Sequence, residues 1–267
     1  MSSPVPAGPL AVRWRELRLG EVRAGAVAVA EVEVENAGGA TWRSAEGGGV
    51  LLSYHWLDSF GNAIVWDGIR TPFPQAVAPG ERTCIEVRVR GPMPPGPYRL
   101  ALDLVDEGRV WFEEVGNALL ERDVEVAPRI ERALAARGGD PAALAAQEEP
   151  LVDEADASAV AHLGPGCAPL PDWSRRVLDA HQEGFAAVGG AVEPAGGFLA
   201  RRRAARPLAP WAPGPGRVPG FSELLLCPSL VRDVGAELAE PVHGLPALRP
   251  PEGEPWVHDG RIVVRIH

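Results

Sequence analysis

Residues 54–74, which read YHWLDSFGNAIVWDGIRTPFP, bring together the side chains of this chain that are best suited to bind a ligand. An indole can stack on the apolar face of a sugar ring, while a carboxylate and a guanidinium can bond to its hydroxyl groups or to an acidic substituent. The candidate ligand-binding residues are Trp66, Asp67 and Arg70, with His55 and Trp111 at the border of the site. A structural alternative stays open, in which an Asp67–Arg70 pair only ties the loop to the neighbouring strand.

No pattern in the sequence indicates catalysis or metal binding. There is no G-x-S-x-G elbow, no H-E-x-x-H motif, no phosphate loop and no G-x-G-x-x-G after a strand. The six histidines are scattered and have no metal-ligand spacing. The three cysteines, Cys84, Cys167 and Cys227, are far apart and are read as reduced thiols of a cytoplasmic protein. We therefore expect no catalytic residue, no metal and no cofactor, and we favour a binding protein over an enzyme.

The elements that position the candidate site are predicted to form an antiparallel β-sandwich. Between about residues 9 and 127, short alternating runs rich in β-branched residues are separated by turn signals. Roughly seven or eight runs at this spacing are typical of an immunoglobulin-like fold. The clearest runs are AVAVAEVEVEN (26–36), VLLSYHWL (50–57), TCIEVRVR (83–90) and YRLALDLV (98–105). In the first of these runs the apolar phase shifts between Val29 and Val32, which indicates a β-bulge.

Alternation along residues 50–57 separates core positions from candidate site positions. The more apolar set, which we expect to face the core, is Val50, Leu52, Tyr54 and Trp56. Trp56 is therefore predicted to be structural. His55 falls on the opposite face, beside the turn at 58–62 and the loop that follows.

Four segments of the first half share one recurring pattern: VENAGGATW (34–42), PGE (79–81), GPMPPGPYRLALDLVDEG (91–108) and WFEEVG (111–116). The pattern resembles the immunoglobulin-like accessory domains of bacterial cell-surface polysaccharide assembly proteins. Some of these accompany glycosyltransferases, and others are carbohydrate-binding tails of polysaccharide-exporting ABC transporters. WLDSFGNAIVWDGIRTPFP is similar to the segment of that group in which an aromatic strand, a D-x-x-G turn and an Arg-Thr-x-x-Pro loop follow one another. The resemblance implies a carbohydrate-binding accessory module in polysaccharide biosynthesis.

A second resemblance leads to a different class of partner. Four tryptophans of the first half, Trp42, Trp56, Trp66 and Trp111, look like those of the four-tryptophan domain of the autophagy receptor next-to-BRCA1. That domain binds proteins. A protein–protein interaction scaffold is therefore the alternative function.

The sequence predicts three regions: an immunoglobulin-like sandwich at 1–128, a helical and acidic connector at 129–171, and a small α+β region at 172–267 packed on the rest. Residues 128–139 and 140–149 are short helix candidates, and the second begins with Asp140 as N-cap and Pro141 at the first helical position.

Residues 171–190 form the strongest helix candidate of the second half, capped by Asp172 and ended by Gly189 and Gly190. His181 is read as a packed helix residue. VGGAVEP (188–194) resembles a segment near the acceptor side of family 2 glycosyltransferases, but no D-x-D motif or nucleotide-sugar half accompanies it. A degenerate glycosyltransferase fragment is therefore a weaker alternative.

The end of the chain combines an irregular segment with regular structure. Residues 207–221 are too rich in Pro and Gly for regular structure, and Trp211 and Phe221 are expected to anchor them. Residues 256–266 are predicted to form a β-hairpin with Asp259 and Gly260 at its turn.

Charge and hydropathy argue against a nucleic-acid partner and against a membrane span. The formal net charge is −10, and residues 1–128 hold 12 Arg against 18 acidic residues. Neither half is basic, so we expect no nucleic-acid partner. The sequence has no apolar run long enough to span a membrane and no secretory signal at its start, so we expect a cytoplasmic protein.

Overall fold

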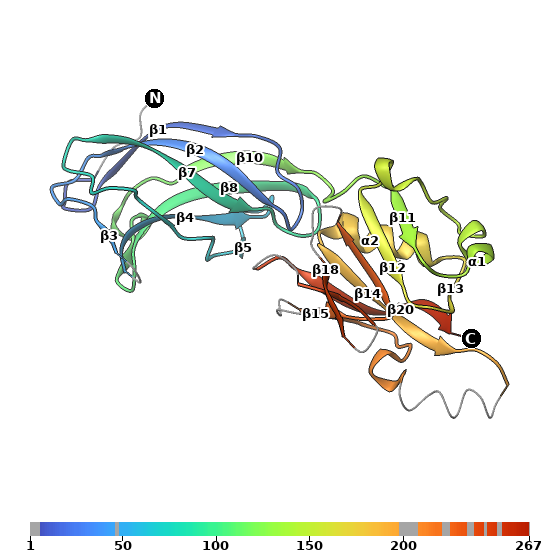
Figure 1. Ribbon diagram of the computed structural model, residues 1–267. Coiled ribbons are helices and arrows are strands. Elements are labelled where there is room, and N and C mark those ends of the chain that lie inside the picture. Colours follow the sequence, from blue (N-terminus) through green and yellow to red (C-terminus); the bar gives the residue numbers. More distant parts are fainter. Residues whose placement is uncertain are drawn as a thin grey trace. The chain divides into compact units, whose positions relative to one another are not determined.

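The computed structural model describes residues 6–45, 48–197, 208–220, 225–233, 238–242, 245–249 and 253–266. The chain divides into two compact units, Met1–Ala127 and Pro128–His267, and each is considered by itself (Figure 1). The fold is mainly β, which confirms the predicted fold class.

In its described residues, the first unit is a sandwich of two antiparallel sheets (Figure 1). One sheet has the order β1 (Val12–Leu19), β2 (Val27–Asn36) and β7 (Arg82–Arg90). The other has the order β10 (Leu120–Val126), β8 (Gly96–Asp106), β4 (Gly48–Leu57) and β3 (Ser44–Ala45). Shorter strands extend it: β5 (Ala63–Val65) and β6 (Thr71–Pro72) pair with β4, and β9 (Val110–Trp111) pairs with β8 ahead of the 3-10 helix η1 (Glu113–Val115).

The core of the sandwich lies between the inner faces of these sheets. The predicted inner set of β4 is buried, and Leu100, Leu102 and Leu104 of β8 pack in the same cluster. Trp56 is fully buried, and its Nε1 donates a hydrogen bond of 2.8 Å to the carbonyl oxygen of Arg90. The prediction that Trp56 is structural is confirmed.

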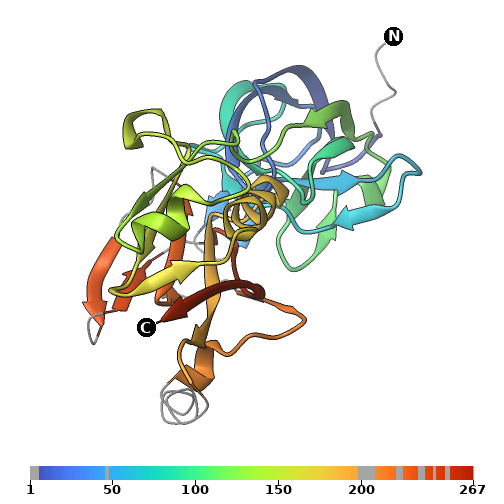
Figure 2. The ribbon, with the colours of Figure 1, turned by 90° about the vertical axis from the view of Figure 1, so that its right-hand side faces the viewer.

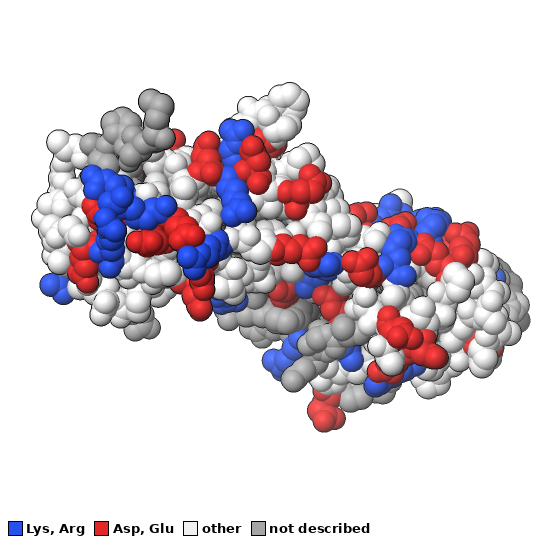
Figure 3. Space-filling view, turned by 90° about the horizontal axis from the view of Figure 1, so that it is seen from above, with Lys and Arg blue, Asp and Glu red and all other residues white. Residues whose placement is uncertain are grey.

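The outer face of the β1–β2–β7 sheet carries charges of both signs (Figure 3). Arg13, Arg15 and Arg82 converge on Glu35, whose side chain is 11% exposed. The predicted bulge in β2 was wrong: Val29 is 57% exposed on this face, and the shift of register lies in β1 between Trp14 and Glu16.

The second unit is built on a mixed sheet. Its order is β11 (Leu134–Arg137), β12 (Ala159–Leu163), β17 (Ser229–Asp233), β14 (Ala187–Pro194), β20 (Trp256–Ile266) and β13 (Cys167–Pro169), with β15 (Arg217–Gly220) paired to β20. A small antiparallel sheet has the order β16 (Leu225–Leu226), β19 (Leu245–Leu248) and β18 (Leu238–Val242). The helices are α1 (Pro141–Ala145) and α2 (Trp173–Glu183), and the 3-10 helices are η2 (Glu154–Asp156) and η3 (Ala209–Trp211).

Helix α2 packs its apolar side against this sheet (Figure 2). Trp173, Val177 and Leu178 are buried among valines and alanines of the strands. The helix ends at Gly184, which has a φ of 129°, and not at Gly189 and Gly190 as predicted. Those glycines lie in β14, where the close approach of the Ile262 carbonyl oxygen leaves no room for a side chain at Gly190.

The segment 128–139 is not the helix that its sequence indicates. Leu134 and Ala135 are buried in β11, which pairs in parallel with β12. Packing in a sheet thus overrides a local helix preference. The start of the next predicted helix is confirmed, because Pro141 starts α1 and the Asp140 side chain accepts a hydrogen bond of 2.8 Å from the backbone N–H of Ala143. The helix ends at Ala145, before the predicted end at 149.

The predicted hairpin at 256–266 is a single strand with a bulge. Residues before and after the bulge both pair in parallel with β14, which the arms of a hairpin cannot do. The register moves from Gly190 opposite Asp259 to Ala191 opposite Val263. Asp259 is buried at this point, and its carboxylate accepts hydrogen bonds from Arg217 and Arg261.

Two other predictions differ in outcome. Trp211 packs partly buried against the core of the second unit, in agreement with its expected role as an anchor. Phe221 and the arginine-rich run at 201–206 lie outside the described residues.

Candidate functional site

The candidate site lies on the outer face of the β4–β8 sheet, opposite the core of the sandwich. Because side chains alternate along β4, Ser53 and His55 point away from the core. Both are nevertheless buried, His55 to 1% exposure. The polypeptide between β4 and β7 and the segment around β9 must therefore cover this part of the sheet.

His55 is held between two indole rings. It stacks on Trp66 with ring centroids 4.1 Å apart and contacts Trp111 at 4.5 Å. Its Nδ1 donates a hydrogen bond to the backbone carbonyl oxygen of Trp66, since a carbonyl can only accept. Burial lowers the pKa of His55, so the ring is neutral at physiological pH and Nε2 carries a lone pair. Within the described structure, this buried Nε2 has no hydrogen-bond partner.

The loop after β5 approaches β4 closely at Gly68. The Gly68 backbone N–H donates a hydrogen bond of 3.0 Å to the carbonyl oxygen of Tyr54. A side chain at this position would lie 2.6 Å from that oxygen and 2.7 Å from the Tyr54 ring. Only glycine allows the loop to lie this close to the strand, and the loop positions Trp66, Asp67 and Arg70.

Arg70 fastens this loop to the sheet. Its guanidinium donates to Glu107 at 2.8 Å, to Asp67 at 2.9 Å, to Ser53 at 2.9 Å and to the Gly68 carbonyl oxygen at 3.2 Å. It also lies over the ring of Trp111, 4.7 Å from the centroid. The predicted Asp67–Arg70 pair is present, and these contacts give Arg70 a structural role at this site.

Asp103 fixes the segment that carries Trp111. It lies on β8 directly opposite Ser53, and its carboxylate accepts hydrogen bonds from the backbone N–H groups of Leu104 at 2.7 Å and of Glu113 at 3.2 Å. Burial, with a smaller contribution from nearby carboxylates, raises the pKa of Asp103 to about 7. Sequence reasoning missed Asp103, although its position out of phase with the core leucines of β8 was a signal.

Trp66 offers one indole face to the surroundings. The centroid distances, 4.1 Å from His55 to Trp66, 4.5 Å from His55 to Trp111 and 6.1 Å from Trp66 to Trp111, place Trp111 on the same side of the Trp66 ring as His55. Neither ring covers the other face, and Trp66 is 46% exposed. The adjacent Asp67 side chain is 69% exposed.

The structure thus brings all five predicted residues together but gives them different positions. Trp66 and Asp67 are open to a ligand. The other three residues hold these two in place: His55 stacks on Trp66, and Arg70 pairs with Asp67. Trp111 contacts both His55 and Arg70. Sequence reasoning did not identify Ser53 and Glu107 as partners of Arg70, because their spacing along the chain carries no motif.

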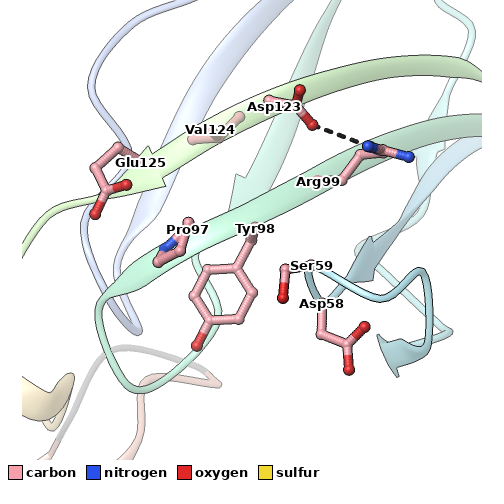
Figure 4. A pocket seen from close by; sticks show the side chains of 8 residues that line it. All are labelled: Asp58, Ser59, Pro97, Tyr98, Arg99, Asp123, Val124 and Glu125. Carbon is pink, nitrogen blue, oxygen red and sulfur yellow. Dashed lines mark hydrogen bonds and ion pairs between the residues drawn. The ribbon is translucent and has the colours of Figure 1, made fainter.

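A separate cavity of about 350 Å³ opens where β8 and β10 lie beside the turn after β4 (Figure 4). Its lining is formed by Asp58, Ser59, Pro97, Tyr98, Arg99, Asp123, Val124 and Glu125. Arg99 pairs with Asp123 at 3.0 Å, and Tyr98 donates to the Pro94 carbonyl oxygen at 2.7 Å. None of the five predicted residues lines this cavity.

In the second unit the titratable groups form structural pairs. His181 is fully buried, as its helix position predicts, and its Nδ1 lies 3.1 Å from Asp233, which also pairs with Arg129. Among the described residues, no group of three or more His, Cys, Asp and Glu side chains could hold a metal ion. No helix in the described ranges is long and apolar enough to cross a membrane.

Comparison with known proteins assigns no family to the chain. No family model matches the chain, and no curated protein matches it. Among solved structures it is similar to the C-terminal domain of Wzt, with 8% identity, 45% of this chain and 75% of that chain covered, and a TM-score of 0.30.

Other solved structures are similar at the same level. A Bordetella pertussis protein assigned as ApaA has 19% identity, with 45% of this chain and 98% of that chain covered and a TM-score of 0.27. A β-glucosidase from Listeria innocua in complex with glucose has 14% identity, with 43% and 16% covered and a TM-score of 0.24. TM-scores this low carry no argument about family or ligand.

Proposed function

We propose that the first unit is a non-catalytic carbohydrate-binding module and that Trp66 and Asp67 form its contact surface. One observation carries the proposal: the Trp66 ring is fixed by His55 on one face and left open on the other, beside an exposed carboxylate. An open indole face stacks on the C–H groups of a sugar ring, and a carboxylate accepts hydrogen bonds from its hydroxyl groups.

The rigidity of the support favours binding. Trp66 is held by a ring stack and by its own carbonyl oxygen, and Asp67 is held by Arg70. A ligand would therefore restrict few side-chain rotations when it binds, which lowers the entropic cost of association. A role in bacterial cell-surface glycan biosynthesis is part of the proposal and rests on the resemblance of the strand and turn segments.

A protein-interaction scaffold is the second candidate, because apolar side chains are exposed nearby in the sequence. Phe60 is 89% exposed, Ile64 45% and Val115 43%. Exposed apolar side chains of this kind can mark a protein interface. Substitution of Phe60 therefore distinguishes the two candidate functions, because it should weaken a protein interface and leave glycan binding unchanged.

The test is binding of the full chain to an array of bacterial surface oligosaccharides, followed by titration of each hit. Trp66→Ala is expected to reduce affinity about fivefold or more, since stacking on an aromatic ring supplies on the order of 1–3 kcal/mol. Phe60→Ala is the matched control and should leave glycan binding unchanged. An array without any hit, or a hit that survives Trp66→Ala, would contradict the proposal.

A further inference from the structure

The surface around Trp66 carries more negative than positive charge. Asp67 and Glu113 both lie close enough to His55 to raise its pKa against the larger effect of burial. Glu113 and Glu114 act in the same sense on Asp103, where burial is again the main cause. The acidic side chains of this environment thus come from two chain segments, the loop after β5 with Asp67 and η1 with Glu113 and Glu114, while Arg70 acts on His55 in the opposite sense.

The arginines at this surface are already paired. Four of the acceptors around Arg70, including the Asp67 and Glu107 carboxylates, take its N–H groups. Arg109, in the turn before β9, pairs with Asp106 at 2.8 Å. Arg70 and Arg109 are thus already paired with acidic side chains, and a carboxylate on a ligand would have to compete with these pairs.

Hydrogen-bonding capacity points the same way. The exposed Asp67 oxygens can only accept hydrogen bonds. Hydroxyl groups and ammonium groups donate to such acceptors, whereas a carboxylate offers no proton and adds repulsion.

We propose that the Trp66 surface selects neutral or amine-bearing glycans and rejects glycans that carry carboxylate groups. This inference rests on the proposed function and specifies its substrate class. A single pyranose ring stacks on the open face of Trp66, and its hydroxyl or ammonium groups donate to Asp67. The acidic surroundings then discriminate among glycans by charge.

The experiment uses the full chain and a panel of oligosaccharides in three groups: hexose and N-acetylhexosamine oligomers, hexosamine oligomers with free amines, and hexuronic acid oligomers. At low salt, the uronic acid group should bind at least about tenfold more weakly than neutral glycans of equal length. High salt should weaken the binding of amine-bearing glycans and leave the binding of neutral glycans nearly unchanged.

A charge variant tests the cause. Glu113→Gln keeps the size of an exposed side chain on η1 and removes one charge near His55. It should reduce the affinity gap between neutral and uronic acid glycans, that is, the ratio of their dissociation constants, about two- to fivefold. Glu86→Gln, an exposed residue of β7 on the opposite sheet, is the matched control and should not change the gap.

The outcomes separate this inference from the proposed function. Tight binding of uronic acid oligomers through Trp66, or a gap that Glu113→Gln leaves unchanged, overturns the selectivity and leaves carbohydrate binding in place. If no group of the panel binds at all, both proposals fail together.

Discussion

At the scale of the residue, the site depends on polar side chains that are buried on the outer face of a sheet. His55 and Asp103 lie on the side of β4 and β8 that faces away from the core, yet both are nearly inaccessible. Parity along a strand correctly assigned the face of His55. Parity could not show that His55 is buried, because the rings that cover it belong to Trp66 and Trp111, which follow it by 11 and 56 residues in the sequence.

Asp103 gives the stability of the first unit a specific dependence on pH. Its pKa of about 7 in the folded state exceeds the value of about 3.9 in an unfolded chain. Between these values the folded state keeps a proton that the unfolded state has lost, so stability falls as the pH rises from about 4 to 7. Asp103→Asn removes this loss, which amounts to at most about 4 kcal/mol.

The expected result is a difference in melting temperature, mutant minus parent, that grows from pH 4 to pH 7 and is constant above it. Thermal denaturation across this range measures it. The amide has one acceptor oxygen instead of two, so a constant offset is also expected. Asp123→Asn, whose side chain is 84% exposed on β10, is the matched control. A difference in melting temperature between Asp103→Asn and the parent that does not change from pH 4 to pH 7 would contradict the raised pKa of Asp103.

At the scale of the element, alternation of apolar and polar residues identified the strands of the sandwich and failed in the second unit. In β7 the outer face is polar and exposed, whereas in β4 and β8 both faces are buried and polar residues such as Ser53, His55 and Asp103 interrupt the apolar sequence. In the second unit, β12 and much of β14 are buried on both faces, so alternation disappears. Short apolar runs of this kind cannot be told from helices by periodicity.

The prediction of a turn in the last strand failed because it rested on a local signal. Asp259 and Gly260 are a strong turn signal, but the structure satisfies Asp259 with two arginines inside a bulged strand. Arg217, one of these partners, comes from β15, which is 42 residues away in sequence. A local signal cannot show that a distant residue will compensate a buried charge.

A substitution at Gly68 tests whether the loop after β5 must lie close to β4 for the candidate site to form. An alanine there would place a methyl group 2.6 Å from the Tyr54 carbonyl oxygen, so the loop must move away from β4. Gly68→Ala is expected to cost about 1–3 kcal/mol and to weaken glycan binding together with stability. Gly20→Ala, which meets no atom within 4 Å, is the matched control for both measurements. Unchanged melting and binding in Gly68→Ala would show that the loop does not depend on this close approach.

At the scale of the whole molecule, the second unit brings together strands that lie far apart along the chain. One sheet joins β11, β12 and β13, which lie between residues 134 and 169, with β14, β15, β17 and β20, so the predicted connector contributes strands to the second unit. The first unit has its own buried cluster, and every member of it lies between Val12 and Val126.

Residues 1–128 are therefore expected to fold without the remainder of the chain. The β-sandwich has both of its sheets and all the residues of its core cluster within this segment. A domain of this length buries enough apolar surface to be stable by itself. The measurement is thermal unfolding of the isolated segment by circular dichroism, where we expect one cooperative transition. A segment that ends at residue 118 lacks β10, an edge strand whose Val126 is buried in the cluster, and should lose this transition. An isolated 1–128 segment that melts without cooperativity would show that the sandwich needs the second unit, and the candidate site would then have to be studied only in the full chain.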